Sequence, residues 1–479
     1  YYSIANRVSY LLNFHGPSVA VDTACSSSLT AIHFACESLS SGLSDCAIAG
    51  GVNLILNPRH YLGLCAMKML SSGPNCKAFG DQADGFVDGE GVGAIILKPL
   101  TKSVEDRDRI YGVIKGSMLN AGGKTNGYTV PNPNAQYALI SEALKRAKID
   151  ARAVSYIEAH GTGTELGDPI EITGLTRAFD AYSTERQYCA LGSVKSNIGH
   201  GESSAGIAGV TKVLLQLRHG QIAPSLNSQT LNPHIDFENT PFRVNQELQT
   251  WQRPVIDGES HPRVAGISSF GAGGANAHLL IAEYITESVE QTQSITVSVV
   301  NPVMIVLSAK NKERLKHYAG DLLQFITACR KEESPLHKLV DLAYTLQVGR
   351  TAMEERLGII VSSWEQLEEK LQAFTATDID SAEEIEDLYR GQVKHNRETL
   401  SVFNADEDTA GMIDLWLDKG KYNKLLDLWV KGLDFNWNGL YGERKANGEY
   451  RPQRISAPTY PFVKERYWYE EEGVTLKSS

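Results

Sequence analysis

Short apolar runs alternate with amphipathic stretches along residues 1 to 285. Runs typical of strands occupy residues 18–23, 45–52, 91–97, 110–119, 154–159, 188–193, 264–269 and 277–282. We expect those at 45–52 and 91–97 to be buried, and the last one to return along its neighbour after the glycine loop at 270–275. Apolar side chains recur every three or four residues, as in amphipathic helices, over residues 1–16, 29–39, 136–148 and 202–219. Short strands that alternate with helices of this length predict a largely parallel sheet covered on both faces.

Signals at helix ends and faces support this pattern. Gly42 is the expected C-cap of the second helix. Asp168, Pro169 and Glu171 fit the N-cap, N1 and N3 positions of a further helix. The helix at 202–219 begins with small residues, so we expect it to approach its neighbours closely and to lie inside the molecule. In the helix at 136–148 one side carries Leu139, Ile140, Ala143, Leu144 and Ala147.

The pattern changes near residue 300. Residues 287–298 are polar and acidic and predict a linker, after which a small separate α/β domain is expected. Its predicted strands are 303–307 and 357–362, and its predicted helices are 311–330, 336–348 and 364–374. Beyond it follow an acidic, loose segment at 375–386, helices within 410–440, and a tail at 455–469 rich in proline and aromatic residues. We expect this tail to be extended and packed on a neighbouring domain.

Composition narrows the functional classes. The 479 residues, 42% hydrophobic and 22% charged, are enough for two or three globular domains. The net charge of -11, with no basic cluster, argues against nucleic-acid binding. No apolar stretch is long enough to span a bilayer and no signal-peptide pattern opens the chain, so we expect a cytoplasmic protein. The pattern is already under way at Tyr1, which suggests a fragment of a longer protein.

Cys25 is the first candidate for chemistry. The seven cysteines form no C-x-x-C pair and predict neither a disulfide framework nor a zinc site. Cys25, however, lies at a strand-to-helix turn, where α/β enzymes expose nucleophiles. The positive end of the helix macrodipole and unpaired backbone N–H groups there favour thiolate over thiol. The alternative is that Cys25 is a small, buried and inert hydrophobe.

Two histidines follow strands at the same expected edge of the sheet. His160 follows the strand at 154–159, and His200 follows the strand at 188–193. One such histidine is more often structural, but two beside a cysteine form a recurring nucleophilic arrangement. A papain-like hydrolase needs only one histidine, so the second one and Lys195 indicate other chemistry. The glycine runs near residues 161 and 271 lack the third glycine of a nucleotide-binding loop, and no P-loop motif occurs.

Three motifs in order resemble the β-ketoacyl synthase family: VDTACSSSL around Cys25, EAHGTGTELGDPIE around His160 and KSNIGH around His200. The closest resemblance is to the ketosynthase domains of modular polyketide synthases, and it runs from about residue 1 to about residue 284. It implies an α/β, thiolase-like fold of two βαβ-rich halves in αβαβα layers. The family's domain begins upstream of Tyr1, so an N-terminally truncated domain is expected here, without strands of the core sheet and the dimer contact.

The resemblance implies a decarboxylative Claisen condensation by an acyltransferase. Cys25 would take the acyl chain from a carrier-protein thioester, and His160 and His200 would stabilise the enolate left when a malonyl-type thioester loses CO2. Each donor aimed at such a charge can be worth about 3 kcal/mol, so no metal or bound cofactor is needed. The residues with further implied roles are Lys195 (electrostatic orientation), Cys25 and Ala272 (backbone oxyanion donors), Thr162 and Thr164 (pantetheine-holding hydroxyls), and Phe270, Gly271 and Gly273 (substrate loop).

The resemblance also implies partners and domains. Substrates would arrive on the phosphopantetheine of acyl carrier proteins, and the complete enzyme would be a homodimer. No G-x-S-x-G elbow follows residue 300, and the tail PTYPFVKERYW comes directly after the adapter-like domain. This order resembles that of synthases whose acyltransferase acts in trans. Ala272 replaces a bulky phenylalanine of fatty-acid synthases, so a bulkier acyl chain is expected to fit. The expected parts are a ketosynthase domain (1–286), a linker (287–300), an α/β adapter (301–400), a helical segment (401–450) and a tail packing on either domain (451–479).

Two alternatives to chain elongation stay open. A non-elongating domain would only pass acyl chains between carriers. The loss of one decarboxylation histidine would favour this alternative, and both histidines are present. An inactive fragment would serve as an interaction scaffold. As a bare lysine, Lys195 would more often be a solvated surface charge.

Overall fold

The chain forms two compact units, which are described separately. The structure, a computed structural model, describes residues 1–285, 302–331, 339–378, 384–396, 407–441 and 452–468. The first unit comprises residues 1–102 and 110–287, and the second comprises 103–109 and 288–479. The predicted linker at 287–298 lies outside the described residues. None of the described helices combines the length and apolar character needed to cross a membrane.

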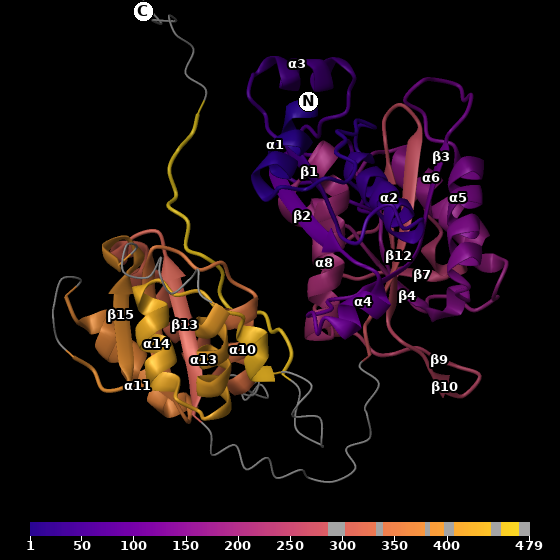
Figure 1. Cartoon of the computed structure of the whole chain (residues 1–479). Helices are drawn as coiled ribbons and strands as arrows, with labels where there is room; N and C mark the ends of the chain where they lie inside the picture. The colour runs from indigo at the N-terminus through magenta and orange to yellow at the C-terminus, as the bar shows by residue number, and fades with distance from the viewer. Residues whose placement is uncertain (286–301, 332–338, 379–383, 397–406, 442–451, 469–479) are drawn as a thin grey trace, which may run out of the picture. The chain divides into compact units, whose positions relative to one another are not determined.

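A six-stranded mixed sheet forms the centre of the first unit (Figure 1). In spatial order its strands are β3 (Val113–Ala121), β12 (Ala275–Ala282), β11 (Val264–Phe270), β4 (Val154–Glu158), β5 (Cys189–Gly192) and β7 (Phe242–Val244). The strands β11, β4, β5 and β7 are parallel, but β12 is antiparallel to both its neighbours. Four of the six strands are thus parallel, as predicted, and the predicted returning strand at 277–282 is β12. The loop between β11 and β12 is far too short for the crossover that a parallel pair needs.

Helices cover both faces of this sheet. One hydrophobic core lies under α5 (Pro133–Ala147) and α6 (Gly167–Asp180), and another lies under α2 (Ser27–Ser40) and α8 (Ala205–His219). All five apolar side chains predicted for one side of α5 are buried. Ala205, Gly206 and Gly209 at the start of α8 are buried too, so this part of the helix lies inside the molecule, as predicted.

Two expectations about strands near the N-terminus are wrong. Residues 18–22 form no strand, because no described strand pairs with them and a β-prone run needs such a partner. β1 (Ala47–Asn53) pairs only with β2 (Gly91–Leu97), in an antiparallel two-stranded sheet. One face of this pair contacts α2 and α8, whereas Ile48 of β1 and Val92 of β2 are exposed, so neither strand is buried as predicted.

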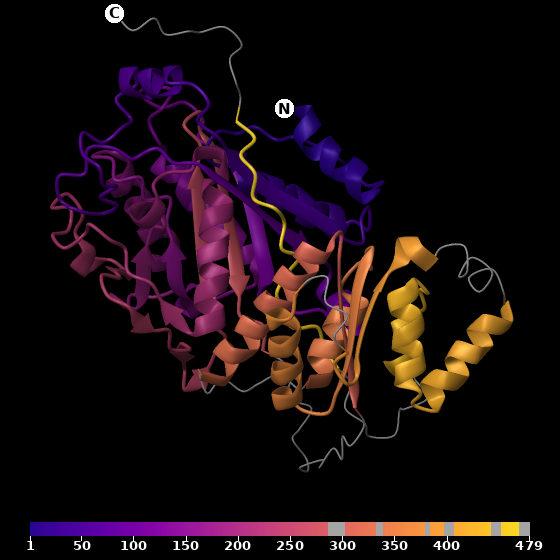
Figure 2. The ribbon, with the colours of Figure 1, turned by 90° about the vertical axis from the view of Figure 1, so that its left-hand side faces the viewer.

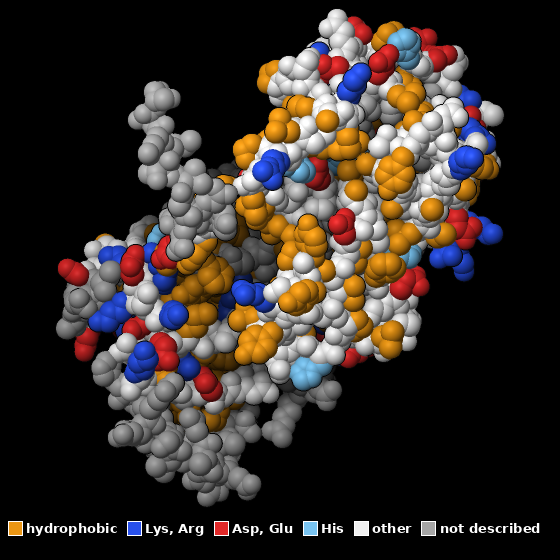
Figure 3. All heavy atoms as spheres, turned by 90° about the horizontal axis from the view of Figure 1, so that it is seen from above, with side chains coloured by type: hydrophobic (Ala, Val, Ile, Leu, Met, Phe, Trp, Pro, Cys, Tyr) orange, Lys and Arg blue, Asp and Glu red, His pale blue; other side chains and the backbone are white. Residues whose placement is uncertain are grey.

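Smaller elements complete the first unit. They are α1 (Tyr2–Leu12), α3 (Arg59–Ala66), α7 (Lys195–Ile198), β6 (Gln221–Ile222), β8 (Gln249–Thr250), β9 (Val255–Ile256) and β10 (Glu259–Ser260). The junction with residues 103–109 falls inside α4 (Leu100–Glu105). The face that carries α1 and α3 has many exposed apolar side chains, drawn in orange in Figure 3.

The second unit is built on a three-stranded antiparallel sheet. Its strands are β13 (Val303–Ala309), β14 (Glu355–Val361) and β15 (Leu388–Gln392), and its helices are α9 (Lys312–Lys331), α10 (Leu339–Val348), α11 (Trp364–Ala376), α13 (Glu407–Asp418) and α14 (Tyr422–Lys431). The strands lie between the orange helices and the yellow helices of this unit (Figure 2). Ile455 and Ala457 of the tail are buried in the same core, while Phe462 and Trp468 are exposed. β15 was not predicted from the sequence.

Candidate active site

Serine hydroxyls hold the turn that carries Cys25. Ala24 has a left-handed backbone (φ 53°), which turns the chain sharply just before the cysteine. Ser26 Oγ donates to Thr23 O at 2.9 Å, and Ser27 Oγ donates to Ala24 O at 2.6 Å. The backbone N–H of Thr23 in turn donates to Ser27 Oγ at 2.9 Å. The serines after the cysteine therefore fix the turn from which α2 begins.

Cys25 and the two histidines converge. The sulfur of Cys25 and one ring nitrogen each of His160 and His200 all lie within 4.8 Å of one another. The two imidazole rings are 5.6 Å apart between centroids and are nearly perpendicular, at 84°. The structure thus brings together at one point the three residues that the sequence placed at neighbouring strand ends and a helix start.

The environment of the histidines keeps both rings neutral. Burial, with the positive charge of Lys195, lowers the pKa of His160 and of His200 well below the usual range. The backbone N–H of Glu202 donates to His200 Nδ1 at 3.1 Å, so the ring proton of His200 is on Nε2. His200 Nε2 is buried and has no hydrogen-bond partner among the described residues. His200 can therefore donate this hydrogen bond to a substrate.

Cys25 is a thiol at neutral pH. Burial raises its pKa to about 11, although Lys195 and the backbone N–H groups of Ala272 and of Cys25 itself act in the opposite direction. The backbone N–H groups at the turn do favour the thiolate, as expected, but desolvation of the charge outweighs them, so the free cysteine keeps its proton. The backbone N–H groups of Cys25 and Ala272, which are the predicted oxyanion donors, hydrogen-bond to the sulfur.

Glu171 shapes the loop that carries His160. Its two carboxylate oxygens accept hydrogen bonds from the backbone N–H groups of His160 and Gly161, each at 2.8 Å. The carboxyl is completely buried, and this burial raises its pKa to about 7. Glu171 lies in α6, so it ties that helix to the end of β4.

Asp168 acts in the same way on two other segments. It accepts hydrogen bonds from the N–H groups of Phe79 at 2.7 Å and of Gly163 at 3.2 Å, and burial raises its pKa to about 6. The prediction that Asp168 caps the helix is wrong, because α6 begins at Gly167 and its N-cap residue is Leu166. The sequence missed this role because the spacing of the two acids also fits a capping box.

Lys195 is buried behind the site. It begins α7 and is only 3% exposed, so the alternative of a solvated surface charge is wrong. Desolvation lowers its pKa, while Glu158 and Glu171 act in the opposite direction. Glu158 is itself fixed by the N–H of Val194 at 2.6 Å. The positive charge of Lys195 contributes to the lowered pKa values of His160 and His200 and acts to lower that of Cys25.

Gly271 allows the substrate loop to approach the cysteine turn. A Cβ atom at Gly271 would lie 2.4 Å from the carbonyl oxygen of Thr23, which no side chain could accommodate without movement. The loop is closed by a hydrogen bond from Gly271 N to Ala275 O at 2.8 Å. This close approach is what brings the N–H of Ala272 to the sulfur of Cys25.

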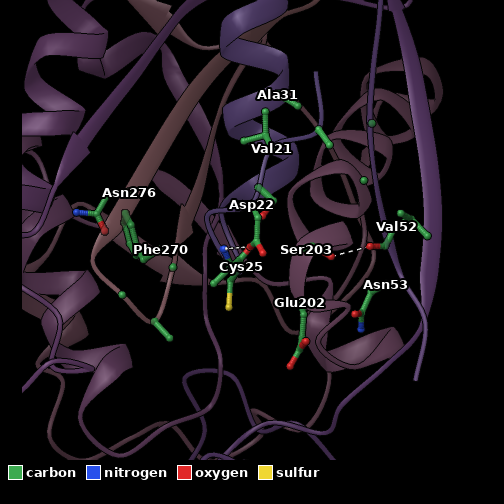
Figure 4. Close-up of a pocket in the computed structure, with 18 of the residues that line it drawn as sticks. Val21, Asp22, Cys25, Ala31, Val52, Asn53, Glu202, Ser203, Phe270 and Asn276 are labelled. Carbon is green, nitrogen blue, oxygen red and sulfur yellow. Dashed lines mark hydrogen bonds between the residues drawn. The ribbon is translucent and has the colours of Figure 1, made fainter. Parts of the chain in front are cut away.

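An open cavity of about 2250 Å³ surrounds these groups. Figure 4 shows the sulfur of Cys25 and the carboxylate of Glu202, which the sequence did not single out, pointing into it. Glu202 lies only two residues after His200, so its position next to the KSNIGH motif could have indicated that it lies near the site. Among the predicted site residues the cavity is lined by Cys25, His160, Thr162, Thr164, His200, Phe270, Gly271, Ala272 and Gly273. Lys195 does not belong to this lining.

Known proteins are similar to this chain in sequence and in fold. Polyketide synthase PksM of Bacillus subtilis is 60% identical over 468 residues, which are 98% of this chain and 10% of the relative. Polyketide synthase ThaG of Burkholderia thailandensis is 48% identical over 97% of this chain and 8% of its own length. The chain thus spans about a tenth or less of these curated relatives. The solved ketosynthase from module 6 of the bacillaene synthase of Bacillus subtilis is 42% identical, with a TM-score of 0.86 over 97% of this chain and 77% of that one.

Three family models match successive parts of the chain. The β-ketoacyl synthase N-terminal domain matches residues 1–103, and the β-ketoacyl synthase C-terminal domain matches residues 111–229. A RhiE-like, KS-MAT linker domain matches residues 306–378, within the second unit. The chain therefore belongs to the β-ketoacyl synthase family of condensing enzymes and carries its thiolase-like fold, in the form found in polyketide synthase ketosynthases.

Proposed function

We propose that the first unit extends a polyketide chain by decarboxylative Claisen condensation, as an acyltransferase of the β-ketoacyl-carrier-protein synthase type. The observation that carries this proposal is the convergence of one sulfur and two neutral imidazoles within 4.8 Å. A single bound thioester could touch all three groups. Substrates would arrive on the phosphopantetheine of acyl carrier proteins, with Thr162 and Thr164 holding the pantetheine chain.

In the first half-reaction the sulfur of Cys25 attacks the acyl carbonyl of a carrier thioester. A C–S bond to Cys25 forms, the C–S bond to the carrier breaks, and the thiol proton of Cys25 passes to the released pantetheine thiolate. The oxyanion of the tetrahedral intermediate is held by the backbone N–H groups of Cys25 and Ala272. The raised pKa of Cys25 means that this proton leaves as the new bond forms.

In the second half-reaction a malonyl-type thioester enters the same cavity. Its carbon–carboxylate bond breaks, CO2 leaves, and the electron pair forms an enolate whose oxygen accepts hydrogen bonds from His160 and His200. Neutral imidazoles suit this step, because they donate without giving up a proton to the oxygen. The enolate carbon then attacks the Cys25 thioester, and the cysteine leaves as a thiolate that is reprotonated by solvent.

The two half-reactions can be tested apart with the full chain. Loading of Cys25 is followed by intact-protein mass spectrometry, and CO2 release from a malonyl carrier protein is measured separately. We expect Cys25→Ala to abolish loading but not decarboxylation, and His160→Ala and His200→Ala to lose decarboxylation while still loading. Exposed His219 provides the control variant, His219→Ala. Chain extension by Cys25→Ala would refute the proposal, and loading without CO2 release in the parent chain would indicate a non-elongating transfer domain.

The second unit is proposed to be the adapter of an assembly line whose acyltransferase acts in trans. The match of residues 306–378 to a KS-MAT linker domain supports an adapter. We further propose a cytoplasmic homodimer as the working form. Reconstitution with a separate acyltransferase and carrier protein tests the trans arrangement, because extension should then require both added proteins.

A further inference from the structure

A second cluster of metal-ligating side chains lies at the edge of the same cavity. His60 of α3, Asp88 before β2 and Glu202 before α8 each place one donor atom within 4.8 Å of the other two. His60 Nε2 lies 3.2 Å from Asp88 Oδ2 and 3.1 Å from Glu202 Oε1. The proposed condensation assigns no role to these three side chains.

The spacing of the donor atoms fits tetrahedral zinc. Bonds of about 2.0–2.1 Å to nitrogen and oxygen place neighbouring ligands of a tetrahedron roughly 3.3 Å apart, close to the two separations from His60 Nε2. Imidazole is a preferred ligand of zinc, whereas calcium and magnesium take oxygen ligands in larger number. One imidazole and two carboxylates leave a fourth position for water or a substrate oxygen.

Asp88 is an independent sign that the cluster is built to hold a cation. Its side chain is fully buried, and Oδ2 accepts no hydrogen bond of good geometry among the described residues. The other oxygen, Oδ1, accepts from the N–H of Gly89 at 3.0 Å, so Oδ2 is the atom presented to His60 and Glu202. A buried carboxylate oxygen left in this way is costly unless a cation pairs with it.

The main chain holds two of the ligands in place. Residue 88 lies beside His200, because Gly89 N donates to His200 O at 3.1 Å and His200 N donates to Val87 O at 2.7 Å. The N–H of Glu202 is fixed by His200 Nδ1. Only His60, whose side chain is 36% exposed, comes from a surface helix. Such preorganisation favours a metal site over a chance meeting of surface groups.

The charge of the cluster also calls for a cation. Within the described part of the chain, no lysine or arginine forms a salt bridge with Asp88 or Glu202, and His60 is their ion-pair partner. Two carboxylates therefore share one imidazole as their charged neighbour beside the cavity. We propose that His60, Asp88 and Glu202 form a zinc-binding site at the cavity edge, with its fourth position facing the cavity that holds Cys25.

Zinc titration of the chelator-treated full chain tests this proposal, with a chromogenic chelator as competitor. We expect one zinc per chain at this site, and binding weakened about tenfold or more in His60→Ala and Glu202→Gln, since each variant loses a direct ligand. The control His219→Ala should bind as the parent does. Because His60 is on the surface, His60→Ala is expected to fold, which a thermal melt checks. No binding by the parent, or equal binding by both variants and the parent, would overturn the proposal.

A second measurement distinguishes this site from the Cys25 group, whose sulfur and imidazoles could themselves take zinc. Binding at His60, Asp88 and Glu202 should survive Cys25→Ala and leave Cys25 open to alkylation by iodoacetamide. Cobalt bound there should show no thiolate charge-transfer band. Loss of binding in Cys25→Ala, protection of Cys25 by zinc, or a thiolate band would place the metal at the catalytic cysteine and refute the proposal. None of these readouts depends on the proposed condensation.

Discussion

A single methyl group at Gly271 should disable the proposed oxyanion hole while leaving the fold intact. The Cβ atom of an alanine would lie 2.4 Å from Thr23 O, 3.1 Å from Ala275 O and 3.2 Å from Ser26 Oγ, where ordinary contact begins at 3.4 Å. Two of these atoms are backbone carbonyls that cannot rotate away. The loop in Gly271→Ala must therefore move by about 1 Å away from the cysteine turn.

This movement sets the size of the expected effect. An oxyanion donor acts at 2.7–3.1 Å, and losing one costs roughly 100- to 1000-fold in rate, about 3–4 kcal/mol. A shift of about 1 Å takes the N–H of Ala272 out of that range, so acyl loading of Cys25 should slow by about 100-fold. Decarboxylation depends on His160 and His200, which lie on other loops, and should change much less.

The assay compares loading and CO2 release in one preparation. Loading of Cys25 from an acyl carrier thioester is timed by intact-protein mass spectrometry, and a thermal melt verifies folding. Gly63→Ala is the matched control, since a Cβ atom at Gly63 meets nothing within 4 Å, and it should behave as the parent does. If folded Gly271→Ala loads Cys25 at the parent rate, the N–H of Ala272 does not hold the oxyanion.

The remaining predictions concern charge. Alkylation of Cys25, followed by peptide mass spectrometry, should rise about tenfold per pH unit from pH 7 to 9 because its pKa of about 11 lies higher; a plateau near pH 7 would contradict a desolvated thiol. Lys195→Met should slow this alkylation at pH 8, and Lys145→Met should not. Glu171→Ala should lower the free energy of unfolding, measured by urea denaturation, by about 2–4 kcal/mol, since two buried N–H groups lose their acceptor. If Glu171→Gln, which keeps an acceptor oxygen, lowers this free energy by the same amount, the reasoning is wrong. The Glu171 carboxyl has a folded pKa of about 7 against 4.5 when unfolded, so its contribution should fall as pH rises through that range, and the pH dependence should flatten in Glu171→Gln.

Local signals predicted the parts of the fold that depend on local physics. The side of α5 that carries Leu139 and Leu144 could be predicted because helical spacing alone decides which side chains are buried. The absence of a strand at 18–23 could not be predicted, since a strand forms only when another strand pairs with it, and none of the described strands pairs with this run. The return of β12 alongside β11 could be predicted, because a short glycine loop leaves room only for a hairpin.

The proposed catalytic groups were easier to predict than the groups that hold them in place. His160 and His200 could be placed together because they lie on the segments that follow two neighbouring parallel strands, β4 and β5. The spacing of Asp168 and Glu171, in contrast, fits both a helix cap and a pair of acceptors for loop N–H groups. A helix start can be satisfied by other groups, and here Thr164 Oγ1 accepts from Gly167 N at 3.2 Å. The N–H groups of a buried loop between strand and helix have fewer choices, and leaving them unpaired costs more. The acids therefore bind the loop, and the position of His160 depends on a helix that contributes no catalytic group itself.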